Sequence, residues 1–346
     1  SQGTVLLISG DRRVRLPAAT ERSMRGAGGV PGEGAWIVGD GGYLARVEAD
    51  GLRVLSAGST RSLLAAGALA GSLWFVGQWG TILRAEGRAL VEIESPTDAA
   101  LSGLIPYAED ELLAIGDAGT LLGITWQGVR TLESGTQATL HDGLAEDGFV
   151  IAVGAGGTIL RGMPSAFVEE RVPGVGELWS IAGSSVDALA VGEGGVLLRV
   201  HRVGVERVDC ETERTLRGAW LEDGVGYAVG EGGIILRVDA EGACTVEHDG
   251  GPALHAIGRG PDGSLLALGE AGRALRRLPL PEGERAGASP SIWRSTDLGA
   301  DEISLYGLHR DGRDVYVFGA GGLVLRHPRI DTSPGGGALG ARESGT

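Results

Sequence analysis

The sequence predicts an all-β fold, a β-propeller of four-stranded antiparallel blades, and three observations support this prediction. First, one hairpin pattern recurs eight times; residues 225–238 show it in full, as two short apolar runs joined by Gly230, Glu231, Gly232 and Gly233. Second, the first glycines of the hairpins are 38 or 39 residues apart, with one last step of 50. These marker glycines are Gly39, Gly77, Gly116, Gly154, Gly192, Gly230, Gly269 and Gly319. Repeats of this length are typical of propellers and solenoids.

The third observation is that the two ends of the chain each carry part of one unit. Residues 3–7 match the turn glycine and the third strand of a unit, and residues 13–16 match the fourth. The last unit, residues 305–326, has its first three strands only. The ends together would complete a ring-closing blade, which removes exposed sheet edges. We therefore predict eight blades, with seven as the alternative, closed by N- and C-terminal strands. Both ends offer a third strand, and the C-terminal copy is favoured because Leu7 stands where most units carry Arg.

The repeat also predicts the domain organisation. Residues 1–327 form one propeller domain, in which residues 1–23 are the half-unit that completes the last blade. Residues 278–304 are an insertion in the seventh unit, and residues 291–295 are expected to be its delayed fourth strand. Residues 328–346 are rich in Gly, Ser and Pro, which is typical of a flexible tail or linker.

Composition excludes some partners. The formal charge is −15, with 45 acidic and 30 basic residues, so neither nucleic acid nor an anionic membrane surface is expected to bind. No apolar run approaches the ~20 residues of a membrane span, and membrane insertion is not expected. All basic residues are Arg and there is no Lys or Asn, which hints at a bacterial source. The compartment is unknown; it would be extracytoplasmic if Ser1 follows a removed signal segment. Cys210 and Cys244 lie at different offsets in adjacent units, so no disulfide is expected.

Two segments carry a family resemblance. Residues 74–84 (Trp-Phe-Val-Gly-Gln-Trp-Gly-Thr-Ile-Leu-Arg) and residues 227–237 resemble the repeat of the photosystem II assembly-factor propellers, within the wider group that has sialidase-type (BNR-like, Asp-box) repeats. The resemblance covers almost the whole chain but is specific for fold only. The family's Asp-Gly-Gly-x-Thr-Trp continuation is absent here, and the family is typically seven-bladed. The resemblance implies a bacterial, non-enzymatic propeller that engages another protein; it does not imply photosystem assembly.

The first strand of each unit carries the candidate binding residues. Its third residue is mostly small, as expected where strands crowd round an axis, but its second residue is variable, large and often polar. Such side chains would line the central channel or its mouth, where many blades converge. The predicted binding residues are His141, Asp142, Trp179, Arg217, Trp220, His255, Tyr306 and His309, together with Trp79 in a hairpin turn.

Each candidate has two interpretations. His141 and Asp142 could form a ligand or metal site with His255, or a channel-lining pair satisfied by water; we predict no metal. Trp79 could anchor a partner or pack on an adjacent loop. Arg recurs seven residues after the marker glycine in seven units, either as a basic ring for an anionic partner or, as we favour, as a structural residue that binds turn carbonyls or a neighbouring carboxylate. Trp36, Trp74, Tyr227 and Tyr316 are predicted to be core residues.

The motif search favours a binding role. The sequence has no Gly-x-Ser-x-Gly, Cys-x-x-Cys or His-Glu-x-x-His, and each glycine turn leads into a strand rather than the helix that a dinucleotide site needs. We therefore predict no cofactor and no enzymatic activity, and a protein-interaction or assembly scaffold that binds another protein through one rim or the channel mouth. The alternative is a carbohydrate-binding protein, or a glycosidase or lyase-type enzyme, with a glycan or small ligand at the mouth. Two carboxylates with an Arg and a Tyr in one pocket would favour that alternative. A structural module of a larger chain is a third possibility.

Overall fold

The computed structural model describes residues 4–9, 12–17, 22–29, 35–48, 51–56, 61–86, 89–260, 262–279, 291–298, 303–311, 314–320 and 324–328. These residues form eight sheets, one for each marker glycine. Seven sheets have four strands each and one has five. The predicted all-β propeller is confirmed.

The first four blades follow the chain in order. Blade one holds β3 (Met24–Gly29), β4 (Ala35–Gly39), β5 (Tyr43–Glu48) and β6 (Gly51–Ser56). Blade two holds β7 (Leu63–Leu69), β8 (Ser72–Gly77), β9 (Ile82–Glu86) and β10 (Ala89–Glu92). Blade three holds β11 (Leu101–Ala108), β12 (Glu111–Gly116), β13 (Leu121–Thr125) and β14 (Gly128–Thr131). Blade four holds β15 (Leu140–Glu146), β16 (Phe149–Gly154), β17 (Thr158–Met163) and β18 (Ala166–Arg171).

The other four blades continue the ring. Blade five holds β19 (Leu178–Gly183), β20 (Ala188–Gly192), β21 (Leu197–Val200) and β22 (Val205–Arg207). Blade six holds β23 (Leu216–Glu222), β24 (Val225–Gly230), β25 (Ile235–Val238) and β26 (Cys244–His248). Blade seven holds β27 (Leu254–Arg259), β28 (Leu265–Gly269), β29 (Ala274–Pro279) and β30 (Ser291–Ser295), so residues 291–295 are the delayed fourth strand, as predicted. Blade eight holds β31 (Leu305–Asp311), β32 (Asp314–Gly319), β33 (Val324–Pro328), β1 (Thr4–Ser9) and β2 (Arg12–Pro17).

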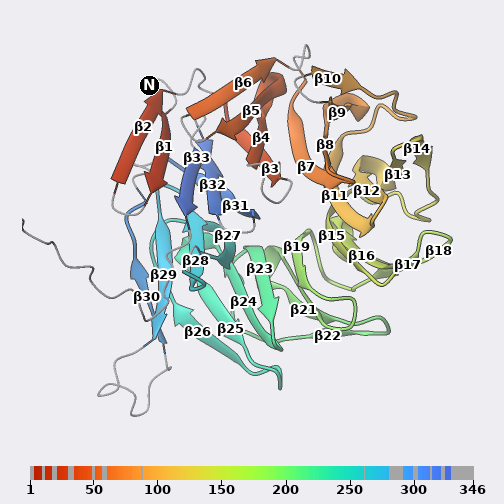
Figure 1. Ribbon diagram of the computed structural model, residues 1–346. Helices are drawn as coiled ribbons and strands as arrows, with labels where there is room; N and C mark the ends of the chain where they lie inside the picture. Colours follow the sequence, from red (N-terminus) through yellow and green to blue (C-terminus); the bar gives the residue numbers. More distant parts are fainter. Residues whose placement is uncertain are drawn as a thin grey trace, which may run out of the picture.

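The first strands of the blades form the inner wall of the ring. Each contacts the first strand of the next blade, from β3 and β7 round to β27 and β31, and β31 contacts β3 again. Figure 1 shows the eight sheets arranged round this centre, with the chain colours running round the ring. The contacts of β3 with β31 and β32 close the propeller.

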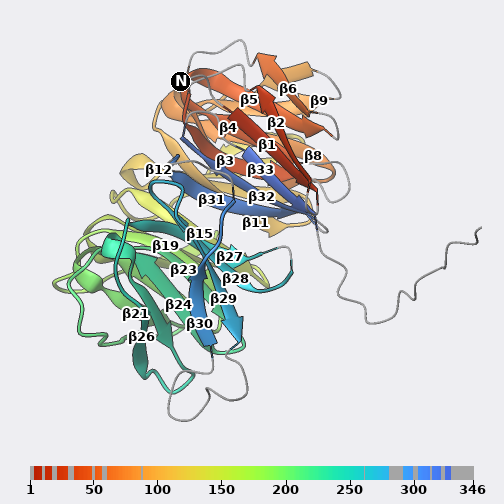
Figure 2. The same cartoon turned by 90° about the vertical axis from the view of Figure 1, so that its left-hand side faces the viewer.

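The closing blade corrects one prediction. The favoured C-terminal strand, β33, does take the third position and pairs with β32. The N-terminal copy, however, is not left over: β1 pairs in parallel with β33, and β2 becomes a fifth strand. Figure 2 shows β1 and β2 beside β33. The two copies run in the same direction and belong to opposite ends of the chain, so no short connection prevents parallel pairing. The predicted fourth strand is therefore displaced outward by one position.

In blades one to six the marker turns are short 3₁₀ turns, and their glycines serve two different purposes. In the second blade, Trp79 and Gly80 adopt positive φ angles of 57° and 63° within η2 (Gln78–Gly80), whereas the marker Gly77 is extended at −170°. A Cβ atom on Gly77 would lie 2.1 Å from the carbonyl oxygen of Ser62. The turn positions therefore require left-handed backbone, as predicted, but the marker glycine is required by close packing instead.

The apolar core lies between the blades. Seven clusters of buried side chains among the described residues each join two successive blades; one, for example, holds Trp74 and Val76 of blade two with Leu112 and Ala114 of blade three. Trp36, Trp74 and Tyr227 are buried in these clusters, as predicted. The side chain of Tyr316 lies outside the described residues.

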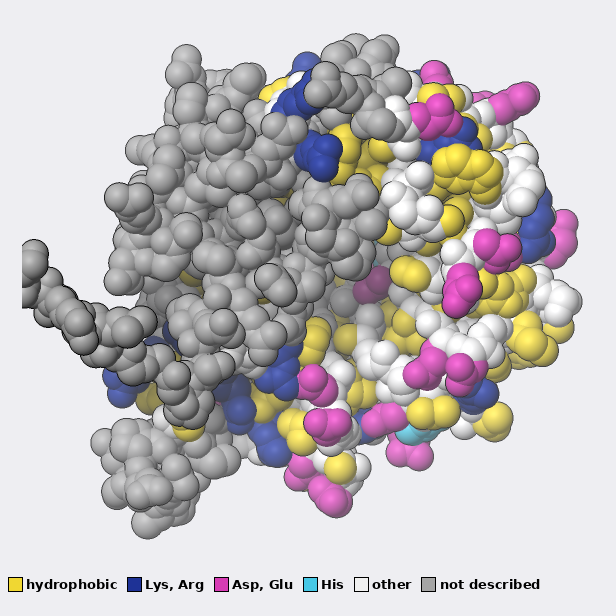
Figure 3. All heavy atoms as spheres, viewed as in Figure 1, with side chains coloured by type: hydrophobic (Ala, Val, Ile, Leu, Met, Phe, Trp, Pro, Cys, Tyr) yellow, Lys and Arg dark blue, Asp and Glu magenta, His cyan; other side chains and the backbone are white. Residues whose placement is uncertain are grey.

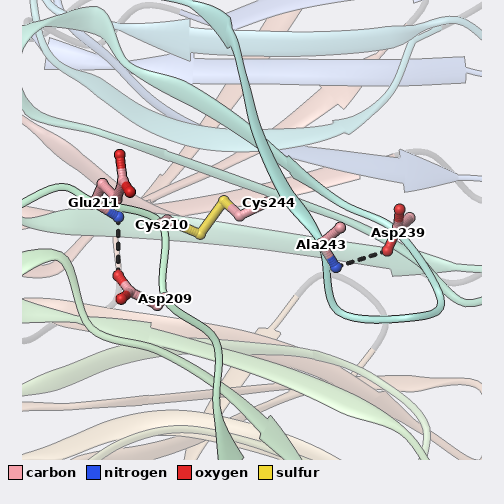
Figure 4. Close-up of a disulfide and its surroundings, with 6 residues drawn as sticks. All are labelled: Asp209, Cys210, Glu211, Asp239, Ala243 and Cys244. Atoms are coloured by element: carbon pink, nitrogen blue, oxygen red, sulfur yellow. Dashed lines mark hydrogen bonds between the residues drawn. A yellow bond between two sulfur atoms is a disulfide. The ribbon is translucent and has the colours of Figure 1, made fainter.

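Two kinds of bond between neighbouring blades bear on the sequence predictions. Cys210 and Cys244 form a disulfide, so the expectation of none was wrong: the loop after β22 of blade five meets the outer strand of blade six, which an offset within one unit does not reveal (Figure 4). The structural interpretation of the recurring Arg is confirmed at Arg161 and Arg199. Arg161 donates to His201 O and Gly204 O of the next blade, at 3.0 and 2.9 Å. Arg199 likewise donates to two carbonyl groups of the next blade.

Candidate binding surfaces

A β-bulge presents the second residue of every inner strand. In all eight blades the pairing of the first two strands skips this residue, as between Leu140 and Asp142 in blade four. A bulged residue leaves the ladder and its side chain is re-aimed. Because strand one begins beside the marker turn, these residues share the end of the propeller that carries the marker turns, here called the marker-turn face. The eight form the mouth belt: Arg25, Leu64, Ser102, His141, Trp179, Arg217, His255 and Tyr306.

The mouth belt brings predicted residues together in pairs. The rings of His141 and Trp179 lie 4.7 Å apart between centroids and are inclined by 30°. The rings of His255 and Tyr306 lie 5.6 Å apart. Burial lowers the pKa of His255, and the nearby charge of Arg217 lowers it further against the opposite effect of Glu270. His141 and His255, considered above as parts of one ligand or metal site, belong to separate pairs.

Carboxylates accompany the cations of the mouth belt. Arg25 makes a two-pronged pair with Asp40, with nitrogen–oxygen distances of 2.8 and 3.0 Å, and Arg217 lies 3.1 Å from Glu231. His141 Nε2 lies 2.6 Å from Glu177 Oε2 of the next blade. Each of these acids therefore already has a cationic or imidazole partner at the mouth.

Asp142 turns away from the mouth. Its carboxylate accepts hydrogen bonds from the Ile181 amide at 3.0 Å and the Ser180 hydroxyl at 3.1 Å, both in blade five. It therefore joins two inner strands rather than forming a site with His141. No group of three or more His, Cys, Asp or Glu side chains within the described part of the chain is placed to hold a metal ion.

Trp79 lies apart from the mouth belt, on the marker turn of blade two. The residue is 65% exposed. It borders a hollow of about 370 Å³ between this turn and the segment that leads from β10 to β11. Glu92, Glu94 and Asp98 line the hollow with exposed carboxylates, and Arg61 lies there too. On the face seen in Figure 3, acidic side chains are likewise spread among apolar and neutral ones.

Trp220 and His309, the fifth residues of their strands, are not in the mouth belt. His309 is half-buried in β31. Trp220 borders a cleft of about 500 Å³ between blades six and seven, together with Glu222, Asp223, Tyr227 and Arg237. The combination of two carboxylates, an Arg and a Tyr thus occurs in one cleft, although away from the channel mouth.

The sequence analysis missed the residues that give this cleft its charge. Arg259 and Arg277 line it, and Glu247 lies behind it. One signal was present: Arg277 stands eight residues after its marker glycine, where six of the other units have Val, Ala, Ile or Gly. Val47, Ala85, Ile124, Gly162, Val200, Val238 and His327 are its counterparts.

Comparisons with known proteins support the fold. No family model matches the chain, and a search of curated proteins finds no match. Many solved structures are similar. The Saccharomyces cerevisiae Sqt1 structure has a TM-score of 0.68 at 13% identity, covering 95% of this chain and 100% of that one. "YCF48 bound to D1 peptide" has a TM-score of 0.60 at 14% identity, covering 90% and 93%. A streptogramin B lyase has a TM-score of 0.54 at 13% identity, covering 89% and 94%.

These identities show a β-propeller and nothing finer, so they do not distinguish the sialidase-type group from other propellers. Among the described residues, no helix is long and apolar enough to span a membrane.

Proposed function

We propose that the protein is a non-catalytic protein-interaction scaffold whose partner docks on the marker-turn face, with Trp79 as the anchor. The observation that carries this proposal is the exposure of Trp79 at a left-handed turn position. The same turn position holds Gly or Ala in the other described blades. A non-glycine residue there costs roughly 1–2 kcal/mol of backbone strain. An exposed ring held at such a position contributes little to folding and is available for binding.

The surroundings of Trp79 indicate the chemistry of the partner. Three exposed carboxylates, Glu92, Glu94 and Asp98, border the adjoining hollow, and the whole chain carries a charge of −15. An aromatic face also attracts a cationic side chain placed over it. A basic segment of the partner fits this surface, with an Arg or Lys side chain over the indole. Likeness to a peptide-bound propeller agrees with a protein partner but does not identify it.

An enzyme or carbohydrate-binding protein acting at the mouth is less well supported. The carboxylates there are engaged: Asp40 with Arg25, Glu231 with Arg217, and Glu177 with His141. A glycosidase needs one carboxyl group to donate a proton and a second to attack or to activate water. Because each of these three acids already bonds an Arg or His side chain, none of them is free for either task.

The test replaces Trp79 by the residue that other turns use. Proteins captured from the source organism's lysate by the intact chain are first identified and purified. Their affinities for the intact chain and for Trp79→Gly are then measured by titration calorimetry. Loss of a hot-spot anchor is expected to weaken binding roughly 30-fold or more, equivalent to at least about 2 kcal/mol. Raising the salt concentration is expected to weaken binding by the intact chain as well, because exposed charges are screened.

Ala118→Gly is the matched control. Ala118 occupies the equivalent left-handed position of blade three, with a φ angle of 52°, but carries no ring. This variant makes the same backbone change and is expected to bind like the intact chain. Equal affinity of Trp79→Gly and Ala118→Gly would contradict the proposal, provided that circular dichroism shows both to be folded.

A further inference from the structure

The cleft between blades six and seven lies far from the proposed docking surface in the fold. Its walls come from the first three strands of each blade, β23–β25 and β27–β29. Glu222, Asp223 and Ser264 lie where the first strand of a blade turns into the second, at the end opposite the marker turns. A cleft of about 500 Å³ is within the size range of small-molecule sites.

A single buried carboxylate organises one side of the cleft. The Glu247 side chain is only 1% exposed. It accepts hydrogen bonds from Nε and Nη2 of Arg277, both at 3.1 Å, and from the Trp293 indole at 2.8 Å. The guanidinium of Arg277 also lies 5.0 Å from the centre of the Tyr227 ring. Arg277 is therefore held rigidly at the cleft wall.

A second guanidinium shares the same carboxylate. Arg237 Nε lies 4.0 Å from a carboxylate oxygen of Glu247, and Arg237 also hydrogen-bonds the Tyr227 hydroxyl. Burial, aided by the charge of Glu247, raises the pKa of Tyr227, so this hydroxyl is neutral at physiological pH and adds no negative charge. Two guanidinium groups thus face one buried carboxylate in a partly desolvated place, which favours an anion beside them. The cleft as a whole is balanced in charge, because Glu222 and Asp223 line it as well.

Apart from Asp223, which is exposed at the turn between β23 and β24, the main remaining parts of the lining are apolar or already paired. Trp220, Val225, Leu265 and Leu278 provide apolar surface. The third cleft arginine, Arg259, pairs with Glu222 and donates to the Gly263 carbonyl. Beside Arg237 and Arg277, the cleft therefore offers a ring-sized apolar wall with Trp220 as its largest element.

We propose that this cleft binds a small organic anion, whose carboxylate or phosphate group lies between Arg237 and Arg277 and whose ring or hydrocarbon body packs against Trp220 and Leu265. The site is independent of Trp79. Guanidinium groups pair with planar carboxylates and with phosphates through two parallel hydrogen bonds, which gives the binding its orientation.

The test measures binding of benzoate, phenyl phosphate and uncharged benzyl alcohol to the intact protein by isothermal titration calorimetry. The two anions are expected to bind and benzyl alcohol is not. Arg237→Gln removes one cation while Arg277 and Trp293 still pair with Glu247, so the variant is expected to fold. It should weaken binding of the anions about tenfold or more, the usual loss of a hydrogen bond to a charged group. Trp220→Ala should weaken the binding of benzoate and that of phenyl phosphate to a similar extent.

Two controls make the result decisive. Arg161→Gln makes the same change at the equivalent position of blade four and is expected to leave benzoate affinity unchanged, as is Trp79→Gly. Absence of anion binding, equal binding of benzyl alcohol, or equal affinity in Arg237→Gln would each overturn the proposal. None of these results bears on the scaffold function, which is tested by the partner and Trp79→Gly.

Discussion

Asp142 shows how one unusual residue in a repeat can serve the fold. Most other blades have a small residue at this position, such as Gly103 or Ala65. The carboxylate of Asp142 accepts three hydrogen bonds: from its own blade through the Gly143 amide, and from blade five through Ser180 and Ile181. The residue that looked most like part of a ligand site is therefore a link between inner strands.

Replacing Asp142 by Asn is expected to lower the free energy of unfolding by about 1–3 kcal/mol at neutral pH. All three partners are donors, and an amide presents an oxygen to only some of them while its NH₂ group faces the rest. Urea denaturation of Asp142→Asn beside the intact protein measures this. A variant as stable as the intact chain would show that the carboxylate contributes nothing to the link.

The same pair of proteins tests a pH dependence. Desolvation, the largest effect, raises the pKa of Asp142 above its ordinary value of 3.8. The folded state therefore binds this proton more tightly than the unfolded state. As the pH falls through the raised pKa towards 3.8, the stability of the intact chain should increase relative to Asp142→Asn; above the raised pKa the difference should be constant. A difference that shrinks as the pH falls through this window would contradict the assigned shift.

At the scale of the turn, two kinds of glycine should respond differently to a methyl group. A Cβ on the marker Gly116 would lie 2.0 Å from the carbonyl oxygen of Ala100, although its backbone is extended. A Cβ on Gly156 would meet nothing within 4 Å, although its φ angle is 66°. Gly116→Ala should lose about 1–3 kcal/mol or more through overpacking. Gly156→Ala should lose no more than about 1–2 kcal/mol of backbone strain. Thermal and urea unfolding of both variants shows which one loses more stability. A greater loss in Gly156→Ala would show that backbone strain outweighs overpacking.

The disulfide acts between elements of adjacent blades. Cys210 lies in the loop after β22 and Cys244 begins β26, 34 residues further along the chain. Cross-linking a loop of this length lowers the conformational entropy of the unfolded chain, which raises its free energy by about 3–4 kcal/mol at 25 °C. Removing both thiols in a Cys210→Ser, Cys244→Ser variant should lower the free energy of unfolding by that amount. Reductant should destabilise the intact chain to the same level and leave the variant unaffected; a reductant effect on the variant would place the sensitivity elsewhere.

For the whole molecule, sequence periodicity predicted what every blade repeats. The marker glycines located all eight hairpins, because each turn meets the same steric demand. The second residues of the inner strands, which the sequence pointed to, all lie at a β-bulge, and their role in binding stays a prediction. Contacts made by residues that differ from one unit to the next were harder to predict. The disulfide and the pairing of Glu247 with Arg277 depend on which loop or strand of one blade meets the next, and offsets within a unit contain no such information.

The position of β1 was unpredictable for a related reason. Two strands with similar apolar patterns compete for one place beside β32, and the outcome depends on the pairing of the whole sheet. The sheet accommodates both, β33 in the third position and β1 beside it. Different strands therefore close the ring and protect the sheet edge. The ring is closed by direct contacts of β3 with β31 and β32, whereas β1 and β2 cover the outer edge of β33.

A variant that lacks residues 1–17 tests this separation. The contacts of β3 with β31 and β32 remain, so we expect a closed propeller with one cooperative but lower melting transition. The bared edge of β33 has unpaired backbone groups and should promote pairing between molecules. Sedimentation velocity should then detect concentration-dependent association that the intact chain lacks, and a synthetic peptide of residues 1–17 should reverse it by pairing with β33. Loss of the cooperative transition would mean that β1 and β2 are needed for closure itself, whereas unchanged melting and no association would mean that they do not protect the edge.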